Sequence, residues 1–364
     1  MMRVLVPAAI VYVAFRIYSI LPLKKGGKIA VLSVYGLAAL AFLLSVTSLS
    51  DHLPMWLARI AYIFGNSWLI FLVYAFIAFL LCDILILMRI LPSKLLKQNA
   101  ISCAVIFSLI AGCLTYGAVQ YRHKYRAEMT VESSKISKPV KIVLASDLHA
   151  GYHNTYKDIR RWVDIINAEK PDLILLGGDL VDRSLRAVTA DHDASALKHF
   201  AAPVYSCLGN HEYYAGVEDA IAFYQAAGIT VLKDSVAKAC GLTIVGRDDA
   251  KNEERKPLHR LLRQVPAREF VLLLDHQPKD LVEAQLLGVD FQFSGHTHSG
   301  QIWPMNWIVR MTFEQSHGPL QKGATHYYIS SGLGIWGGRF RIGSRSEYLV
   351  LNIVPATHPA IVQP

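Results

Sequence analysis

Side chains that commonly bind metal ions follow five short apolar runs in the last two thirds of the chain. The surrounding segments read LASDLHAG, LLGGDLVDR, CLGNHE, LLLDHQP and FSGHTHSG. The candidate ligands within them are, in chain order, Asp147, His149, Asp179, Asn210, His276, His296 and His298. Each group comes just after a strand-like run, and the carboxyl ends of strands are where α/β sheets present ligand sites. The pattern therefore predicts one site that draws on five separate segments.

These seven side chains form a mixed set of carboxylate, amide and imidazole donors. Such a set suits Mn, Fe or Zn ions, in contrast to the thiolate sites of softer metals. Seven donors are more than one ion requires. The set therefore predicts two divalent ions about 3.5–4 Å apart, an arrangement that favours in-line displacement at phosphorus. The identity of the metal pair stays open.

Each motif also has a purely structural interpretation. An isolated Asp-x-His pair is weak evidence for a metal site, and the segment around Asp179 could form a turn. Asn210 in GNHE could occupy a left-handed position in a loop. The pair His296 and His298 is a stronger signal, because a spacing of two on an extended segment suits chelation. Five such motifs, each at a strand exit, favour the metal site over coincidence.

Alternating strand-like and helix-like segments must position these residues. From Val140 onward, short β-branched runs such as KIVLAS and DLILLGG alternate with amphipathic segments such as TYKDIRRWVDIINAEK and VEDAIAFYQAAG. Further strand-like runs are PVYSCLG, LTIVG, EFVLLL, DFQFSG, HYYISSG and EYLVLNI. This alternation predicts an α/β architecture rather than a helical bundle or an all-β barrel.

The order of the motifs, D-x-H, GD-xx-D, GNH-E, H and GH-x-H, resembles that of the calcineurin-like metallophosphoesterase superfamily. The resemblance covers residues 140–354. Five segments are most similar in sequence to the branch of phosphodiesterases and UDP-2,3-diacylglucosamine diphosphatase-like enzymes. These segments are SDLHAG, GGDLVDR, LGNHEYY, SGHTHSGQI and GLGIWGGRFRIGSRSEYLVLNI. The resemblance implies a four-layer αββα sandwich, with two facing sheets and helices outside, and hydrolysis of a phosphodiester or pyrophosphate bond.

The same resemblance implies a role for each matching residue. The ligands of the first ion would be Asp147, His149, Asp179 and His298. The ligands of the second would be Asp179, Asn210, His276 and His296, with Asp179 as the bridge. Water activated between the two ions would attack phosphorus. His211 would protonate the departing oxygen, because an imidazole titrates near neutral pH.

Several charged residues near the motifs have roles that the sequence leaves open. Asp275 departs from the resemblance, since a small or apolar residue is expected before His276. It could orient His276 through a hydrogen bond or simply form a turn. Either Asp182 or Asp275 could orient His211. Candidate phosphate clamps, for each of which a surface salt bridge is an equal alternative, are Arg183, Arg339 and Arg341.

An apolar segment, GQIWPMNWIVRM, follows the last motif and contains Trp303, Met305, Trp307 and Ile308. One interpretation is that it packs under the domain. The other is that Trp303 and Trp307 face a bilayer and shape the entrance for a lipid substrate, because Trp is common at membrane interfaces. Trp336 could join the same rim. The second interpretation favours an amphiphilic substrate.

The first third of the chain has a different composition. Hydrophobic residues make up 53% of the whole chain, above the roughly 45–50% of soluble domains, and the excess lies in this third. Four stretches are long and apolar enough to span a membrane, roughly 2–23, 29–49, 67–91 and 99–120. The interrupted segment 51–67 is expected at the membrane interface.

The predicted parts are a four-helix transmembrane region over 1–120, a linker over 121–139, the catalytic domain over 140–354 and a tail over 355–364.

Charge divides the chain at a similar place. Residues 1–126 hold 12 Lys/Arg and two acids, whereas residues 127–364 hold 25 Lys/Arg and 26 Asp/Glu. Because the basic residues flank apolar segments, they indicate a bilayer as partner, and no nucleic-acid binding is expected. The basic loops predicted to be cytoplasmic contain Lys24, Lys25, Lys28, Arg89, Lys94 and Lys97. This topology places the catalytic domain on the extracytoplasmic side of an inner or plasma membrane.

Other functions are compatible with this sequence. The anchor could merely localise a nucleotide or general phosphodiesterase, or the domain could bind metal as a sensor without turnover. The presence of His211 beside a full ligand set favours an enzyme. Within the predicted spans, Arg16 and Asp83 are expected either to form a structural pair or to extend toward the membrane interface, although they could instead line a proton or substrate path.

Overall fold

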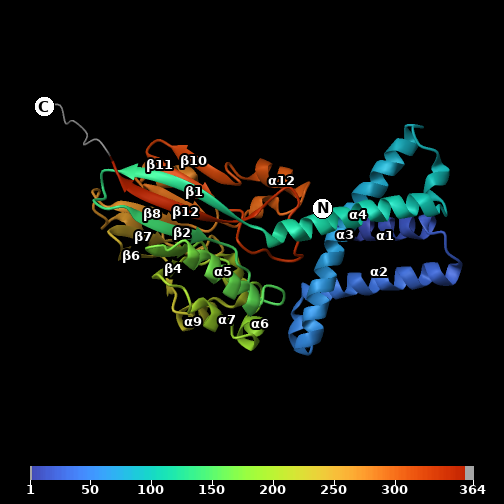
Figure 1. Ribbon diagram of the computed structural model, residues 1–364, viewed down its shortest axis with the longest axis horizontal. Helices are drawn as coiled ribbons and strands as arrows, with labels where there is room; N and C mark the ends of the chain where they lie inside the picture. Colours follow the sequence, from blue (N-terminus) through green and yellow to red (C-terminus); the bar gives the residue numbers. More distant parts are fainter. Residues whose placement is uncertain (1, 357–364) are drawn as a thin grey trace. The chain divides into compact units, whose positions relative to one another are not determined.

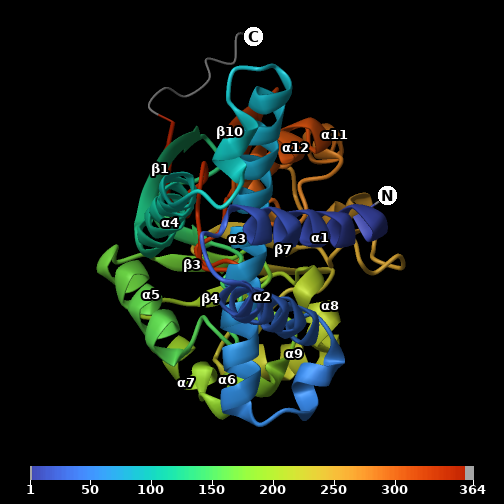
Figure 2. The same ribbon diagram turned by 90° about the vertical axis from the view of Figure 1, so that its right-hand side faces the viewer.

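The chain folds into two compact units. The structure is a computed structural model and describes residues 2–356. The first unit covers the chain up to Gln120 together with Gly337–Phe340, and the second covers Tyr121–Trp336 and continues from Arg341. The helices of the first unit are blue to cyan in Figure 1 and Figure 2, and most of the second unit is green to red.

The first unit consists mainly of apolar helices. Its elements are α1 (Met2–Ile20), α2 (Lys25–Ser45), η1 (Ser48–His52), α3 (Met55–Leu87), η2 (Ser93–Leu96) and α4 (Ala100–Arg122). Among the described residues, α2, α3 and α4 are long and apolar enough to cross a membrane, whereas the apolar stretch of α1 is the shorter Val6–Ile20. Three of the four predicted spans are therefore supported as candidate membrane helices, and α1 stays a prediction as a fourth.

Helix α3 begins earlier than the predicted third span. The placement of segment 51–67 at the membrane interface stays a prediction, and most of this segment is continuous with the span, since Met55 starts a helix of 33 residues that runs through Gly65 to Leu87. Gly65 does not interrupt this helix, because it lies where α3 packs closely against α2. A Cβ there would lie 2.3 Å from the backbone nitrogen of Phe42 in α2. At 1.5 Å per residue this helix measures about 50 Å, more than the roughly 30 Å of hydrocarbon in a bilayer.

The two charges inside the predicted spans form an ion pair. Arg16 Nη2 lies 2.6 Å from Asp83 Oδ2, and the hydroxyl of Tyr12 donates a hydrogen bond to the same carboxylate. Pairing reduces the high cost of charge in apolar surroundings. The predicted structural pair is therefore confirmed.

Two six-stranded sheets form the framework of the second unit. The strands of the first sheet are β1 (Lys124–Ser133), β2 (Val140–Ala145), β3 (Leu173–Leu176), β4 (Val204–Ser206), β5 (Thr230–Val231) and β12 (Ser346–Pro355). Those of the second are β6 (Ser235–Ala239), β7 (Leu242–Gly246), β8 (Phe270–Leu274), β9 (Phe291–Ser294), β10 (Gly318–Lys322) and β11 (Thr325–Ile329). The strand orders are β1-β12-β2-β3-β4-β5 and β10-β11-β9-β8-β7-β6. Both sheets are mixed, with parallel strands at their centres.

Alternating side chains of the strands build separate apolar layers. In β2, Ile142 and Leu144 belong to a core shared by the two sheets, whereas Val143 and Ala145 pack against helices on the outer side. The helices over the first sheet are α5 (Tyr156–Ala168), α6 (Leu185–Ala190), α7 (Asp193–Leu197) and α9 (Val217–Ala226). Those over the second are α10 (Leu258–Leu262) and α11 (Leu281–Leu286). The predicted α/β class with two facing sheets is confirmed.

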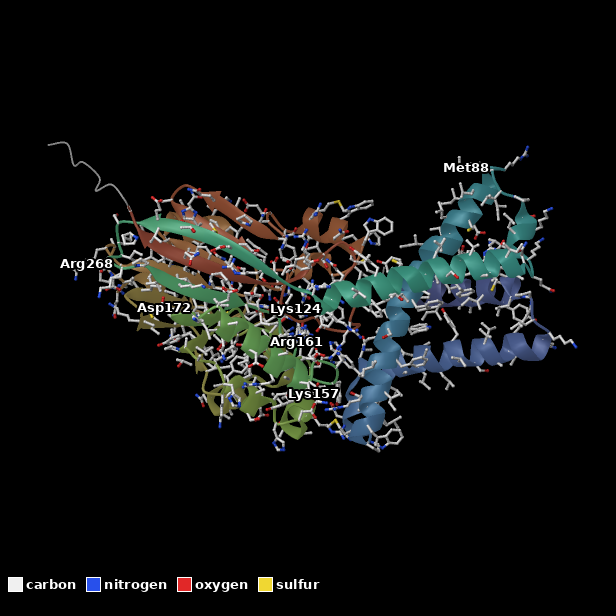
Figure 3. The ribbon with its side chains drawn as sticks, viewed as in Figure 1. Met88, Lys124, Lys157, Arg161, Asp172 and Arg268 are labelled. Carbon is white, nitrogen blue, oxygen red and sulfur yellow. The ribbon has the colours of Figure 1, made fainter. Side chains whose placement is uncertain are left out.

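Helix α5 illustrates how the sequence pattern sets this packing. It begins after Thr155, which forms a capping box with Asp158. Its buried face consists of Ile159, Trp162, Val163 and Ile166. Lys157 and Arg161, labelled in Figure 3, lie on its exposed side. The helical spacing of apolar residues therefore buries one stripe and leaves the charges in water.

Strand β1 replaces most of the predicted linker over 121–139. It pairs in parallel with β12 along its whole length. Val131 is buried in the core between the sheets, and Ala127 and Met129 pack against the same core. The linker prediction was wrong because Ala127, Met129 and Val131 alternate with polar residues, so the inward-facing side of the strand is not apparent from the composition. In the predicted tail, Pro355 ends β12, and residues 357–364 lie outside the described residues.

Candidate metal centre

The five predicted motifs lie at the carboxyl ends of strands from both sheets. The first three follow the ends of β2, β3 and β4 at Ala145, Leu176 and Ser206, and the last two follow β8 and β9 at Leu274 and Ser294. Two short helices begin within the motifs, α8 (Asn210–Ala215) and η3 (His298–Gly300). Because parallel strands end at a common edge, their terminal loops gather the candidate ligands. The predicted placement at strand exits is confirmed.

Five of the candidate ligands have an unusual backbone conformation. Their φ angles are positive, namely 56° at Asp147, 47° at His149, 53° at Asp179, 69° at His296 and 48° at His298. Side chains rarely adopt this left-handed region, which costs of order 1–3 kcal/mol per residue and persists only where the surrounding structure imposes it. The loops therefore hold these residues in place against local strain.

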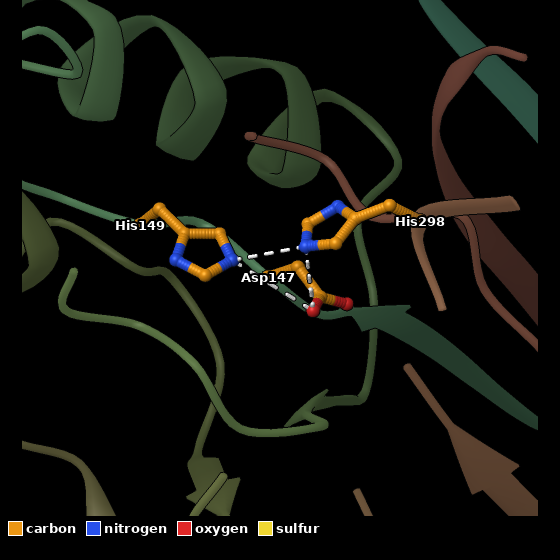
Figure 4. A group of neighbouring side chains, drawn as sticks. All are labelled: Asp147, His149 and His298. Atoms are coloured by element: carbon orange, nitrogen blue, oxygen red, sulfur yellow. Dashed lines mark hydrogen bonds and ion pairs between the residues drawn. The ribbon is translucent and has the colours of Figure 1, made fainter. Parts of the chain in front are cut away.

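Asp147, His149 and His298 form the first cluster (Figure 4). His149 Nε2 lies 3.1 Å from His298 Nε2. Asp147 Oδ1 lies 3.9 Å from His149 Nε2 and 3.4 Å from His298 Nε2. Burial, together with the charges of His149 and Arg341, lowers the pKa of His298 well below its usual value. A neutral imidazole is the form that can bind a metal ion.

Asp179, His276 and His296 form the second cluster. His276 Nε2 lies 3.1 Å from Asp179 Oδ2, and its Nδ1 donates to the carbonyl oxygen of Gly177 at 2.6 Å. The second contact fixes the orientation of the ring. His296 Nδ1 lies 2.8 Å from Asn210 Oδ1. Burial and the neighbouring His276 lower the pKa of His296 to about 3, so this ring is also neutral.

Asp179 joins the two clusters. Its Oδ2 lies 3.8 Å from His149 Nε2 and 3.1 Å from His276 Nε2. Although burial opposes ionisation, the imidazoles of His276, His211 and His149 hold the pKa of Asp179 well below its usual value. The structure thus brings all seven candidate ligands together. A buried, ionised carboxylate that contacts imidazoles of both clusters fits two divalent cations that share one ligand.

His211 lies beside these clusters, with its ring centroid 4.5 Å from that of His149. Its Nδ1 is 3.2 Å from Asp182 Oδ1, and its backbone N–H donates to Asp179 Oδ1 at 2.9 Å. Burial disfavours the imidazolium, but Asp179 and Asp182 outweigh this effect and raise the pKa of His211 to about 9. A protonated imidazole in this position can serve as a general acid.

Comparison with known proteins assigns the domain that carries this site to a family. The calcineurin-like phosphoesterase family matches residues 140–300, a range that includes all seven candidate ligands. This segment is a calcineurin-like metallophosphoesterase domain. The resemblance to the calcineurin-like metallophosphoesterase superfamily is therefore confirmed, whereas the branch within it stays a prediction.

Curated relatives of this metallophosphoesterase domain come from distant organisms. An uncharacterized metallophosphoesterase of Helicobacter pylori is 30% identical over 243 residues, which are 63% of this chain and 63% of the relative. A Danio rerio protein named transmembrane protein with metallophosphoesterase domain is 29% identical over 59% of this chain and 53% of its own. The chain thus spans less than two thirds of the length of these relatives. A 5'-nucleotidase precursor from Thermus thermophilus has a TM-score of 0.39 at 15% identity, covering 59% of this chain and 55% of its own.

Glu212, the glutamate of the GNH-E motif, is a buried residue of the metallophosphoesterase domain for which no role was predicted. Its carboxylate accepts hydrogen bonds from the backbone N–H groups of Asp179 at 3.0 Å, Val181 at 3.3 Å and Gly209 at 2.6 Å. It therefore ties the loop after β3 to the start of α8. A signal was present, because a Glu three residues after the N-cap Gly209 matches the capping-box position.

The alternatives for Asp275 and Asp182 are resolved by their contacts. The carboxylate of Asp275 accepts hydrogen bonds from Arg247 at 3.3 Å and Arg255 at 3.2 Å. Asp182 is the carboxylate that contacts His211. Asp275 therefore ties the loop after β7 to the end of β8, and Asp182 is the residue placed to orient His211.

Arg341 is a structural residue and not one of the predicted candidate phosphate clamps. Its side chain is fully buried, and it donates to the carbonyl oxygens of His298 at 2.7 Å, Ser331 at 2.5 Å and Gly334 at 2.9 Å. Burial lowers the pKa of Arg341 to about 10. The prediction was wrong because these carbonyl groups come together only in the folded domain.

The other two candidate clamps differ in position. Arg183 is exposed and directly follows Asp182, so it stays a candidate contact for a substrate phosphate. Arg339 lies within Gly337–Phe340, which belongs to the first unit and not to the metallophosphoesterase domain.

The apolar segment after the last motif forms α12 (Met305–Thr312). Trp307, Ile308 and Met311 are 56%, 50% and 80% exposed. Trp303 contacts Trp307 edge to face, with ring centroids 5.5 Å apart. The interpretation that this segment packs under the domain is therefore wrong for the three exposed side chains, which present an apolar face to the surroundings of the protein.

Proposed function

We propose that the protein is a membrane-anchored, two-metal hydrolase of phosphoric esters. The observation that carries this proposal is the position of Asp179, whose Oδ2 lies 3.8 Å from His149 Nε2 and 3.1 Å from His276 Nε2. A carboxylate shared by two sets of imidazoles suits two cations that act on one phosphoryl group. The family match over residues 140–300 supports the same chemistry.

Each ion would take ligands from loops of both sheets. The first would be held by Asp147, His149, Asp179 and His298. The second would be held by Asp179, Asn210, His276 and His296. When bound, divalent ions of the Mn, Zn or Fe type supply Lewis acidity at the phosphoryl oxygens and a more acidic water molecule.

His211 would deliver the proton that the leaving oxygen needs. Asp182 contacts Nδ1 at 3.2 Å, which leaves Nε2 as the nitrogen that can reach a substrate. The raised pKa of His211 keeps the ring protonated at neutral pH. Arg183, exposed next to Asp182, would contact a phosphate oxygen of the substrate.

The proposed substrate is amphiphilic, a phosphodiester or pyrophosphate linked to lipid. Two features support this class. The chain has three candidate membrane helices among its described residues, and α12 exposes Trp307 and Met311 shortly after the candidate ligand His298. Trp303 and Trp307 would form the rim that a lipid chain passes. The basic loops of the first unit support an extracytoplasmic site.

The test is metal-dependent hydrolysis by the full chain purified in detergent. Bis-p-nitrophenyl phosphate and p-nitrophenyl phosphate are offered after chelation and after re-addition of Mn, Zn or Mg. Activity is expected to return with metal in the wild type and to be nearly absent in Asp179→Asn. The matched control is Asp164→Asn, since Asp164 lies on α5 with its side chain 55% exposed. Bound metal without turnover of any ester by the wild type would contradict the proposal.

The lipid preference needs a separate comparison. The double variant Trp303→Ala/Trp307→Ala is expected to lose the preference for detergent-dispersed lipid diesters and to keep its rate on bis-p-nitrophenyl phosphate. Trp56→Ala is the control, because Trp56 is a 65% exposed tryptophan of the first unit. If the double variant treats both substrates as the wild type does, Trp303 and Trp307 have no part in lipid selection.

A further inference from the structure

The turn that carries Asp147 and His149 is held by a buried asparagine outside the metal-binding motifs. Asn154 is completely buried, and its Nδ2 donates to the carbonyl oxygens of Leu148 at 3.0 Å and His149 at 3.1 Å. A third carbonyl group, that of Ile335, lies 3.1 Å from the same nitrogen. Since His149 has a φ angle of 47°, its backbone needs such external support.

The amide of Asn154 is itself fixed by a tyrosine. The hydroxyl of Tyr121 donates to Asn154 Oδ1 at 2.6 Å. Three carbonyl groups on one side and a hydroxyl donor on the other leave only one orientation of the amide that satisfies every partner. The contact therefore determines which atom of Asn154 faces the turn at His149.

Tyr121 belongs to the core of the domain although it lies in the last turn of α4. It is 4% exposed and packs in the same apolar cluster as Trp162 and Leu148. Lys124 Nζ lies 3.8 Å from the centroid of its ring and donates to its carbonyl oxygen at 2.9 Å. The side chain is therefore held from several directions, and its hydroxyl is directed at Asn154.

We propose that Tyr121 and Asn154 are positioning residues for the metal ligand His149. Tyr121 orients the amide of Asn154, and Asn154 holds the carbonyl groups of Leu148 and His149 so that the imidazole faces Asp147 and His298. The inference rests on the proposed two-metal function. It assigns to the final turn of a candidate membrane helix a part in shaping the metal site.

The test measures Mn²⁺ affinity of the full chain in detergent, from the electron paramagnetic resonance signal of free Mn²⁺ during titration. Tyr121→Phe removes only the hydroxyl, and Asn154→Asp replaces the donating amino group with an oxygen. Both variants are expected to raise the Kd of one of the two Mn²⁺ ions by about 10- to 100-fold, the usual effect of removing a residue that supports a metal ligand. Their hydrolytic activity should fall at low Mn²⁺ and return at high Mn²⁺.

Tyr348→Phe is the matched control. Tyr348 packs in the same apolar cluster, but its hydroxyl donates to Glu169 at 2.9 Å. It is expected to bind both ions as the wild type does. Wild-type Mn²⁺ affinity in Tyr121→Phe and Asn154→Asp would overturn the inference. An equal loss of Mn²⁺ affinity in Tyr348→Phe would also overturn it, because it would indicate a general loosening of the apolar cluster. If the wild type itself does not bind two ions, the proposed function fails and the inference fails with it.

Discussion

At the scale of single residues, the site depends on neighbours with different tasks. His211 contacts Asp182 and lies beside His149, whereas the next residue, Glu212, points into the domain and accepts three backbone hydrogen bonds. One residue can therefore act on the substrate, and the other holds the loop that carries the shared carboxylate.

His211→Ala is expected to lower kcat by about 10²- to 10⁴-fold on esters with poor leaving groups, because such oxygens need a proton as they depart. The loss should be smaller with nitrophenyl esters. In the wild type the rate should fall as pH rises and His211, whose pKa is raised to about 9, loses its proton. Two bound cations disfavour the positively charged ring of His211, so they should shift the fall in rate to lower pH.

The measurement is a pH–rate profile of kcat for both classes of ester. His259→Ala is the control, because His259 is exposed on α10. An alkaline fall of the same shape in His211→Ala would show that another group delivers the proton.

Glu212→Gln is expected to weaken metal binding as well as the fold. The amide offers one acceptor oxygen where the carboxylate offers two, so at least one backbone N–H among Asp179, Val181 and Gly209 loses its partner. An unsatisfied buried group of this kind costs about 1–3 kcal/mol of unfolding free energy. Denaturant unfolding and Mn²⁺ titration check the two effects. Glu218→Gln is the control, because the side chain of Glu218 is 83% exposed. It should change neither the free energy of unfolding nor the Mn²⁺ affinity.

At the scale of elements, α2 and α3 approach each other closely at Gly65. A Cβ at Gly65 would lie 2.3 Å from the backbone of Phe42, whereas a Cβ at Gly112 in α4 would meet nothing within 4 Å. Gly65→Ala must therefore push α2 and α3 apart, and overpacking of this kind costs about 1–3 kcal/mol. Gly112→Ala should leave the midpoint of thermal unfolding in detergent unchanged or raise it slightly. Equal midpoints in the two variants would contradict the close contact between α2 and α3.

At the scale of the whole molecule, the position of the cysteines allows the proposed topology to be tested. Cys240 is exposed and Cys207 is buried in the metallophosphoesterase domain, while Cys82, Cys103 and Cys113 lie in apolar helices. A membrane-impermeant maleimide is expected to label the protein in intact cells, and Cys240→Ser should abolish the label. Labelling that appears only after lysis would place the domain in the cytoplasm.

The sequence by itself determined the class of the domain and the position of its candidate ligands. The candidate ligands Asp147, Asp179 and His296 each follow an apolar strand-like run in the sequence. This local pattern can be recognised without knowing how the strands pack. The apolar length of α2, α3 and α4 is likewise a property of composition alone. Such features depend on neighbours in the chain, so they can be predicted without knowing the tertiary contacts.

Only the tertiary structure decided the roles of residues whose partners are distant in sequence. Arg341 contacts carbonyl groups from Ser331 and His298, and Tyr121 reaches Asn154 across 33 positions. Nothing local distinguishes such an arginine from a surface one, or such a tyrosine from an interfacial one. Their roles follow from burial, because a buried polar group must find a partner and the fold determines which one lies within reach.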